Sequence, residues 1–163
     1  MTDNTTPMAA GAATGTVPAS EAGAGGGAVG TRPRQPRDQV TIRLPAEGAY
    51  LSVLRTATAG LAARLDFTLD EIEDLRIAVD EACAMLLAQA DPGSSLECDF
   101  TLDQSAMTIA VSADATQGRP PAKDSFAWTV LSALAGSVDS IVGPDGRVTI
   151  VMRKARRQQP GSG

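Results

Sequence analysis

Alternation of apolar and polar residues marks four short segments of this chain, and we expect a fifth short segment, residues 138–142, to be a strand as well. In the four, apolar side chains such as Val40, Ile42 and Leu44 recur at every second position. Because successive side chains of a strand point to opposite faces of a sheet, this period predicts half-buried β-strands. The predicted strands cover residues 39–44, 96–102, 107–111, 138–142 and 147–152.

Short polar turns connect two pairs of these strands. Residues 103–105, Asp-Gln-Ser, join the second strand to the third, and the Gly-Pro-Asp-Gly sequence at 143–146 joins the fourth to the fifth. Strands that pair in hairpins run antiparallel, so we expect a mostly antiparallel sheet.

Apolar residues at spacings of three and four predict three amphipathic helices. The first covers residues 46–65, the second begins after Thr68 and ends near Ala90, and the third ends near Gly136 after an N-cap at Asp124 or Ser125. Their predicted buried stripes are Tyr50, Leu54, Ala57, Leu61 and Leu65; Ile72, Leu75, Val79, Ala82, Cys83 and Leu86; and Phe126, Val130, Leu131 and Leu134.

The start of the second helix carries a recognisable capping signal. Thr68 followed by Glu71 predicts a capping box, and Phe67 with Ile72 predicts a hydrophobic staple. The first two turns also hold the acids Asp70, Glu71, Glu73 and Asp74. The positive end of the helix dipole favours anions there, so this cluster has a structural explanation beside a binding role.

The predicted order is strand, helix, helix, two strands, helix, two strands. It indicates an α+β fold, a two-layer sandwich in which a mostly antiparallel sheet of about five strands is covered on one face by three helices. Residues 39–153 form this domain. Residues 1–38 are rich in Ala, Gly and Pro and poor in large apolar residues, so we expect them to be disordered, and we expect the same of the basic tail at 154–163.

Composition narrows the chemistry. The chain has no histidine, which excludes a phosphohistidine relay and a Ser-His triad formed within it. Its two cysteines, Cys83 and Cys98, fall on apolar faces and are expected to be buried free thiols. The N-terminal segment lacks a basic start and an apolar core, so we expect no signal peptide, and no run approaches the roughly 18 apolar residues of a membrane span.

The net charge of −5 conceals an uneven distribution. Half of the fourteen basic residues lie outside residues 39–152, against three of the nineteen acids, so this segment carries a net charge of −9. An acidic domain repels nucleic-acid phosphates, so we expect no direct contact with nucleic acid. Its charge suits a basic protein partner, although it also keeps a protein soluble.

Three short motifs carry the candidate chemistry. Glu81 lies in the middle of the second helix, Asp114 to Gly118 follows the third strand, and Gly146 lies in the last turn. In this element order, they resemble the Bergerat-fold ATPase superfamily, and within it the RsbW-type anti-sigma factors. The resemblance implies that Glu81 is the general base of a serine kinase, and that Asp114, Gly118 and Gly146 bind ATP.

The chain departs from the family pattern at several positions. Met85 stands where the family has a Mg²⁺-binding asparagine, and a thioether is a poor ligand for this hard cation. Thr116 replaces the middle glycine of the second motif, and Arg147 replaces the threonine after Gly146. The glycine-rich lid is missing, and Ser125-Phe126-Ala127-Trp128 stands at the next glycine motif. Bulky residues there block the close backbone approach that phosphates need.

A longer pattern points to a subtype. Val-Asp-Glu-Ala-Cys at 79–83, followed by Ser-Phe-x-Trp-x-Val-Leu at 125–131, resembles the actinobacterial anti-sigma-F type. That type implies binding of an alternative sigma factor, release by an anti-anti-sigma antagonist with a STAS domain, and homodimers in the cytoplasm. Arg55 aligns with a family arginine that contacts partners, and it is equally an ordinary exposed helix arginine.

Three functions stay open at this point. The first is an anti-sigma factor that sequesters a sigma-F/sigma-B-like sigma factor in partner switching during stress, without metal or cofactor. The second is an active ATP- and Mg²⁺-dependent kinase that phosphorylates the antagonist. The third is a small α+β binding module for an unknown ligand.

The roles of individual residues stay open as well. Glu81 is either a general base or a remnant held by a backbone donor, and Asp114 either binds nucleotide or starts an Asx turn. Asp80 follows Arg76 by one helical turn, so we expect these two residues to form an exposed ion pair.

Overall fold

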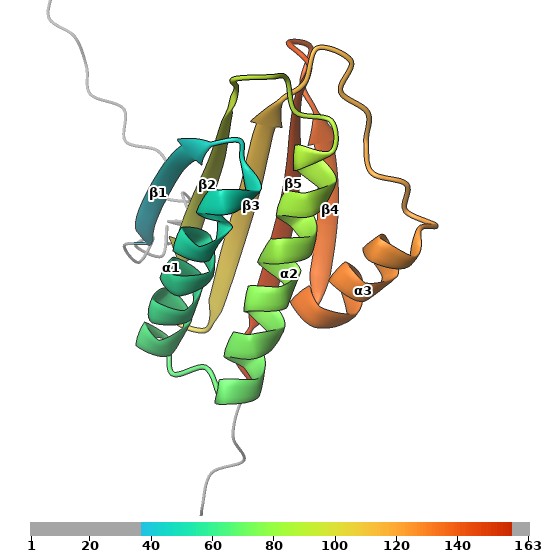
Figure 1. The fold of residues 1–163 in the computed structure, drawn as a ribbon. Coiled ribbons are helices and arrows are strands. Elements are labelled where there is room, and N and C mark those ends of the chain that lie inside the picture. The colour runs from blue at the N-terminus through green and yellow to red at the C-terminus, as the bar shows by residue number, and fades with distance from the viewer. Residues whose placement is uncertain (1–36, 158–163) are drawn as a thin grey trace, which may run out of the picture. The chain divides into compact units, whose positions relative to one another are not determined.

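The computed structural model describes residues 37–157 and shows a five-stranded sheet in the order β1-β2-β3-β5-β4, with every neighbouring pair antiparallel. The strands are β1 (Asp38–Pro45), β2 (Ser95–Leu102), β3 (Ala106–Asp114), β4 (Ser137–Val142) and β5 (Arg147–Ala155). Three helices, α1 (Leu51–Arg64), α2 (Leu69–Leu87) and α3 (Phe126–Ala135), cover one face of the sheet (Figure 1). The predicted two-layer α+β fold is therefore confirmed.

The predicted boundaries of the domain need a small correction. Strand β1 already begins at Asp38, and β5 continues to Ala155, beyond the predicted end at residue 153. Lys154 is buried, and its charge is tolerated there because its ammonium group donates to the Leu134 carbonyl at 2.6 Å and pairs with Asp74 at 3.1 Å. The predictions for residues 1–36 and 158–163 lie outside the described part of the chain.

The face of the sheet under the helices carries the core. Cross-strand neighbours on this face form buried rows, of which Phe100, Ile109 and Met152 are one. The opposite face carries small polar side chains, and the hydroxyls of Ser112 and Thr149 share a hydrogen bond of 2.9 Å there. Because the register fixes which residues are neighbours, alternation assigns each strand residue to one face or the other.

The first helix buries Leu54 of the predicted stripe, and Ala57, Leu61 and Leu65 pack against the core while staying partly exposed. A 3₁₀ turn, η1 (Gly48–Tyr50), precedes α1, and the Tyr50 side chain is 41% exposed. The buried residues of α1 are Leu54, Thr58 and Ala62. Thr58 is tolerated in the core because its hydroxyl donates to the Leu54 carbonyl at 2.7 Å. The prediction that Tyr50 is a core residue is therefore wrong, since the helix starts after it.

The capping box of α2 is confirmed. The Thr68 side chain accepts from the Glu71 backbone N–H at 3.3 Å, and the Glu71 carboxylate accepts from the Thr68 backbone N–H at 2.9 Å. Glu71 is buried, and it also accepts from the Arg157 backbone N–H at 3.1 Å. Burial raises the pKa of Glu71, but these backbone hydrogen bonds outweigh it and hold the pKa below the ordinary carboxyl value.

The third helix corrects another core prediction. Ser125 is its N-cap and accepts from the Trp128 backbone N–H at 3.2 Å. Phe126, at the first helical position, is 83% exposed, whereas Trp128, Leu131 and Ala135 face the core. The prediction that Phe126 begins the buried stripe of this helix is wrong, because Phe126 lies off the stripe that Trp128 begins.

Both cysteines are buried free thiols, as predicted. Burial raises the pKa of the Cys83 thiol to about 12, with a smaller contribution from the Asp80 charge, and burial also raises the pKa of Cys98. A thiol in such a setting is protonated and unreactive at neutral pH. Among residues 37–157 no helix is long and apolar enough to cross a membrane.

Candidate functional site

The structure brings Gly118 and Gly146 into contact beside the end of β3, but it does not bring Glu81 to Asp114. Glu81 projects from α2 in the helical layer, where it is half-buried. Asp114 is the last residue of β3 and pairs in register with Arg147 of β5. Their neighbours Ala113 and Val148 are buried under the helices, so alternation places Asp114 on the opposite face of the sheet. The sheet therefore separates Glu81 from Asp114.

The Asp114 carboxylate has a partner on that open face. Arg147 donates from Nη1 to Asp114 Oδ1 at 2.9 Å and from Nη2 to Glu97 Oε1 at 2.8 Å. All three side chains are partly exposed. Arg147, which replaces the family threonine, thus engages the carboxylate that the resemblance assigns to ATP binding. Within residues 37–157, the Asp114 carboxylate has no recorded hydrogen bond of the alternative Asx turn.

Packing explains the two predicted nucleotide glycines. A Cβ atom on Gly118 would lie 2.5 Å from the Gly146 carbonyl oxygen and 2.6 Å from a Val148 methyl carbon. Gly146 has φ +81°, and a Cβ atom there would lie 2.5 Å from the Ala115 carbonyl oxygen. The two glycines therefore let the last turn pack on the loop after β3. Their proposed contact with phosphates stays a prediction.

Two side chains beyond the end of α2 hold the same loop. Asp91 accepts from the Thr116 backbone N–H at 2.9 Å and from its hydroxyl at 2.8 Å. Gln89 accepts from the Arg119 backbone N–H at 2.9 Å and donates to the Arg119 carbonyl at 3.1 Å. The bond from the Thr116 backbone N–H lowers the pKa of Asp91 below the ordinary carboxyl value. We call these contacts the loop clamp.

Sequence reasoning missed the loop clamp. Asp91 lies just beyond the predicted end of the second helix near Ala90 and before Pro92 and Gly93, a position that is typical of a helix stop and indicates no partner. The sequence offers only a weak signal for these contacts. Gln89 and Asp91 follow a helix, and their partners Thr116 and Arg119 follow a strand about 25 to 30 positions later. Only the packing of α2 against β3 makes them neighbours.

These positions do not fit Mg-ATP in the family manner. Met85 offers a thioether where Mg²⁺ needs an oxygen ligand, and Thr116, at a family glycine position, is tied to Asp91. Asp114 lies on the other face of the sheet and is paired with Arg147. No group of three or more Cys, Asp or Glu side chains within residues 37–157 could hold a metal ion.

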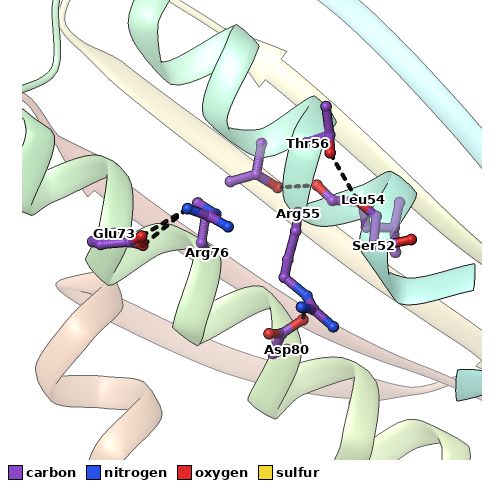
Figure 2. Close-up of polar contacts among 8 residues, drawn as sticks. Ser52, Leu54, Arg55, Thr56, Glu73, Arg76 and Asp80 are labelled. Atoms are coloured by element: carbon purple, nitrogen blue, oxygen red, sulfur yellow. Dashed lines mark hydrogen bonds and ion pairs between the residues drawn. The ribbon is translucent and has the colours of Figure 1, made fainter.

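The surface shared by α1 and α2 has a different character. Arg55 of α1 donates from Nε to Asp80 Oδ1 of α2 at 3.0 Å (Figure 2). The two side chains are 43% and 34% exposed. The expected pair of Asp80 with Arg76 is wrong: Arg76 instead binds Glu73, one turn earlier, at 2.7 Å. Asp80 faces α1 in the folded protein, and the adjacent helix supplies its cation.

The outer side of α1 carries small, weakly apolar side chains. Ser52, Val53, Thr56 and Ala57 line an open hollow of about 450 Å³. The outer positions Gly60 and Ala63 continue this side toward the end of the helix. Small side chains allow another backbone to approach closely. Arg55 extends from the same helix toward α2, where it pairs with Asp80. We call this surface, with Arg55 and Asp80, the α1 face.

Comparison with known proteins gives a family match over most of the described domain. Residues 44–151 match the model of the histidine kinase-like ATPase domain. The protein named serine-protein kinase RsbW from Halalkalibacterium halodurans is 35% identical over 96 residues, covering 58% of this chain and 57% of that protein. The Bacillus subtilis protein of the same name is 42% identical over 53 residues, covering 32% of this chain and 33% of its own length.

A solved structure agrees with this match at the level of the fold. The crystal structure of the RsbU and RsbW domains of Rv1364c from Mycobacterium tuberculosis superposes with a TM-score of 0.58 at 15% identity. The superposition covers 74% of this chain and 33% of that one. The sequence match covers little more than half of the length of the Halalkalibacterium protein and a third of the Bacillus subtilis one.

Proposed function

The chain belongs to the histidine kinase-like ATPase domain family, on its RsbW-type branch, and from this membership we propose that it is an anti-sigma factor that works by surface contact. It binds and sequesters an alternative sigma factor of the sigma-F/sigma-B kind in the cytoplasm. An anti-anti-sigma protein with a STAS domain releases the sigma factor by competing for the same surface. In this proposal the protein is a homodimer that takes part in stress-responsive partner switching.

The observation that carries the proposal is the separation of the nucleotide residues. A kinase must hold phosphates, metal and base at one point, because phosphoryl transfer is catalysed by positioning and charge. Here Glu81 and Asp114 lie on opposite sides of the sheet, and the Asp114 carboxylate already forms an ion pair with Arg147. Sequestration needs only an accessible surface, and the α1 face supplies one.

The charge of the α1 face supports a protein partner. Arg55 uses only Nε for Asp80, which leaves its two terminal nitrogens without a recorded partner among residues 37–157. Arginine at a partly exposed interface position is a frequent centre of binding energy, since its planar fork receives a carboxylate with two hydrogen bonds. Arg55 therefore remains a proposed partner contact.

A binding measurement with the cognate sigma factor tests the proposal. Isothermal titration of the full chain, with and without Mg-ATP, should give the same dissociation constant within about twofold, since no interaction depends on nucleotide. Adding the antagonist should release the sigma factor in both cases. If no complex forms in either condition, the proposal is wrong.

One observation favours the second candidate, an active kinase. Within residues 37–157 the half-buried Glu81 carboxylate has no recorded hydrogen bond or ion pair, so no backbone donor holds it as a remnant. Incubation with the antagonist and labelled ATP tests this function. Transfer of phosphate that is abolished by Glu81→Gln would establish the kinase, whereas no transfer with either protein favours sequestration alone.

A further inference from the structure

The ion pair between Arg55 of α1 and Asp80 of α2 leaves the Nη1/Nη2 edge of the arginine without a recorded partner within residues 37–157. A guanidinium group can meet a carboxylate along its Nη1/Nη2 edge, and this end-on contact does not use Nε. Asp80 receives Nε alone, at 3.0 Å, from beside the arginine (Figure 2). Its carboxylate thus fixes the guanidinium without covering the end-on edge.

Holding the Arg55 side chain in one orientation should raise the binding affinity by a measurable amount. A free arginine has several rotatable bonds, and ordering such a side chain at an interface costs roughly 0.5–1.5 kcal/mol of entropy, which is roughly a three- to tenfold change in affinity. Asp80 lies on rigid α2, and Leu75, Val79, Ala82 and Cys83 of that helix are fully buried. A carboxylate held by a packed helix therefore sets the direction of Arg55 before any partner arrives.

We propose that Asp80 is a positioning residue for partner binding, which presents the free edge of Arg55 to a carboxylate of the sigma factor. This inference rests on the proposed function and extends it to a residue that the family resemblance leaves unassigned. Asp80 makes no contact with the partner's carboxylate and acts only through Arg55. The partner segment it fits carries an acidic side chain that reaches Arg55 where α1 meets α2.

A double-mutant cycle tests the positioning role. Asp80→Asn should weaken sigma-factor binding roughly three- to tenfold, because Arg55 loses its charged anchor. The same substitution in an Arg55→Ala background should change affinity by less than about twofold. Asp80→Glu, which keeps the carboxylate, should restore most of the affinity. A residue with only a structural role would weaken binding equally in both backgrounds.

The neighbouring ion pair provides a matched control. Glu73→Gln removes the partner of Arg76, a pair of similar exposure on the same helix and with a length of 2.7 Å (Figure 2). Because this pair does not involve α1, Glu73→Gln should leave sigma binding unchanged. Thermal unfolding of each variant reports whether the fold is intact.

Three results would overturn the inference. Unchanged or tighter binding by Asp80→Asn would mean that Asp80 does not orient Arg55, or competes with the partner. An equal loss in the Arg55→Ala background would give Asp80 a role independent of Arg55. If the unmodified protein forms no complex with the sigma factor, the proposed function is wrong, and this inference is wrong with it. The titration of the unmodified protein distinguishes this result from the other two.

Discussion

The loop after β3 and the α1 face both contain residues to which the family resemblance assigns a role, yet their side chains have different neighbours. In the loop, Thr116 is bound to Asp91, Asp114 to Arg147, and Gly118 lies against Gly146. On the α1 face, the two terminal nitrogens of Arg55 have no recorded partner within residues 37–157.

The two regions differ in whether their polar side chains have hydrogen-bond partners within the chain. A polar group that is paired within the chain gives stability but has no bonding capacity left for a ligand, whereas an ordered group with free donors can bind. By this criterion the loop region resembles a structural junction, and the α1 face resembles a binding surface. Four changes test the contrast, from the largest expected effect to the smallest.

The largest effect is expected at the last turn. Gly146→Ala should lower the free energy of unfolding by about 2–4 kcal/mol, because the new methyl would meet the Ala115 carbonyl and the residue has φ +81°. Urea unfolding followed by circular dichroism measures it. Gly60→Ala on α1, where no atom lies within 4 Å of an added Cβ, should be neutral or stabilising by up to ~1 kcal/mol. A Gly146→Ala protein of unchanged stability would argue that this glycine is retained for a ligand.

The next effect separates the two regions in binding. Arg55→Ala should weaken the sigma-factor complex by about 2 kcal/mol, roughly thirtyfold, if the α1 face is the interface. Glu81→Gln should change the affinity by less than about twofold, since surface contact does not use a general base. Titration calorimetry measures both. Equal losses in the two variants would erase the contrast between the regions.

A local effect is expected at the loop clamp. Asp91→Ala should speed amide hydrogen exchange at Thr116 and Arg119 while leaving the exchange of the sheet unchanged, because the clamp binds exposed backbone groups. In the unmodified protein, the contact should persist above the ordinary pKa of an aspartate and disappear as pH falls through the lowered pKa of Asp91. The amide chemical shift of Thr116 reports this titration. A shift that does not change with pH would mean that Asp91 does not hold the loop.

The smallest effect is expected from restoring a motif side chain. Met85→Asn returns the family's metal-binding residue but should produce no Mg-ATP binding, because Asp114 stays on the other face of the sheet and paired with Arg147. Calorimetry at high micromolar Mg-ATP tests it, with the unmodified protein as control. Binding that appears with this single change would show that the remaining residues still form a nucleotide site.

Local features of the sequence predicted the elements well. The five predicted segments are strands, the Thr68–Glu71 capping box is present, and the polar turn at 103–105 joins β2 to β3. These features depend on neighbours within four residues, where covalent geometry and local hydrogen bonds fix the structure. Burial was predicted less well, as exposed Tyr50 and Phe126 show, because a hydrophobic residue at the end of a helix need not lie on its inward side.

The sequence by itself determined the elements of this protein, their order, its two-layer class and its family. Tertiary structure decided which polar groups meet: Asp80 with Arg55 instead of Arg76, Asp91 with Thr116, and Asp114 with Arg147. The physical reason is the distance along the chain. Partners 25 or more residues apart are set by strand order, register and helix packing, which no local pattern encodes. The α1 face therefore follows from the fold, although Arg55 could be found in the sequence.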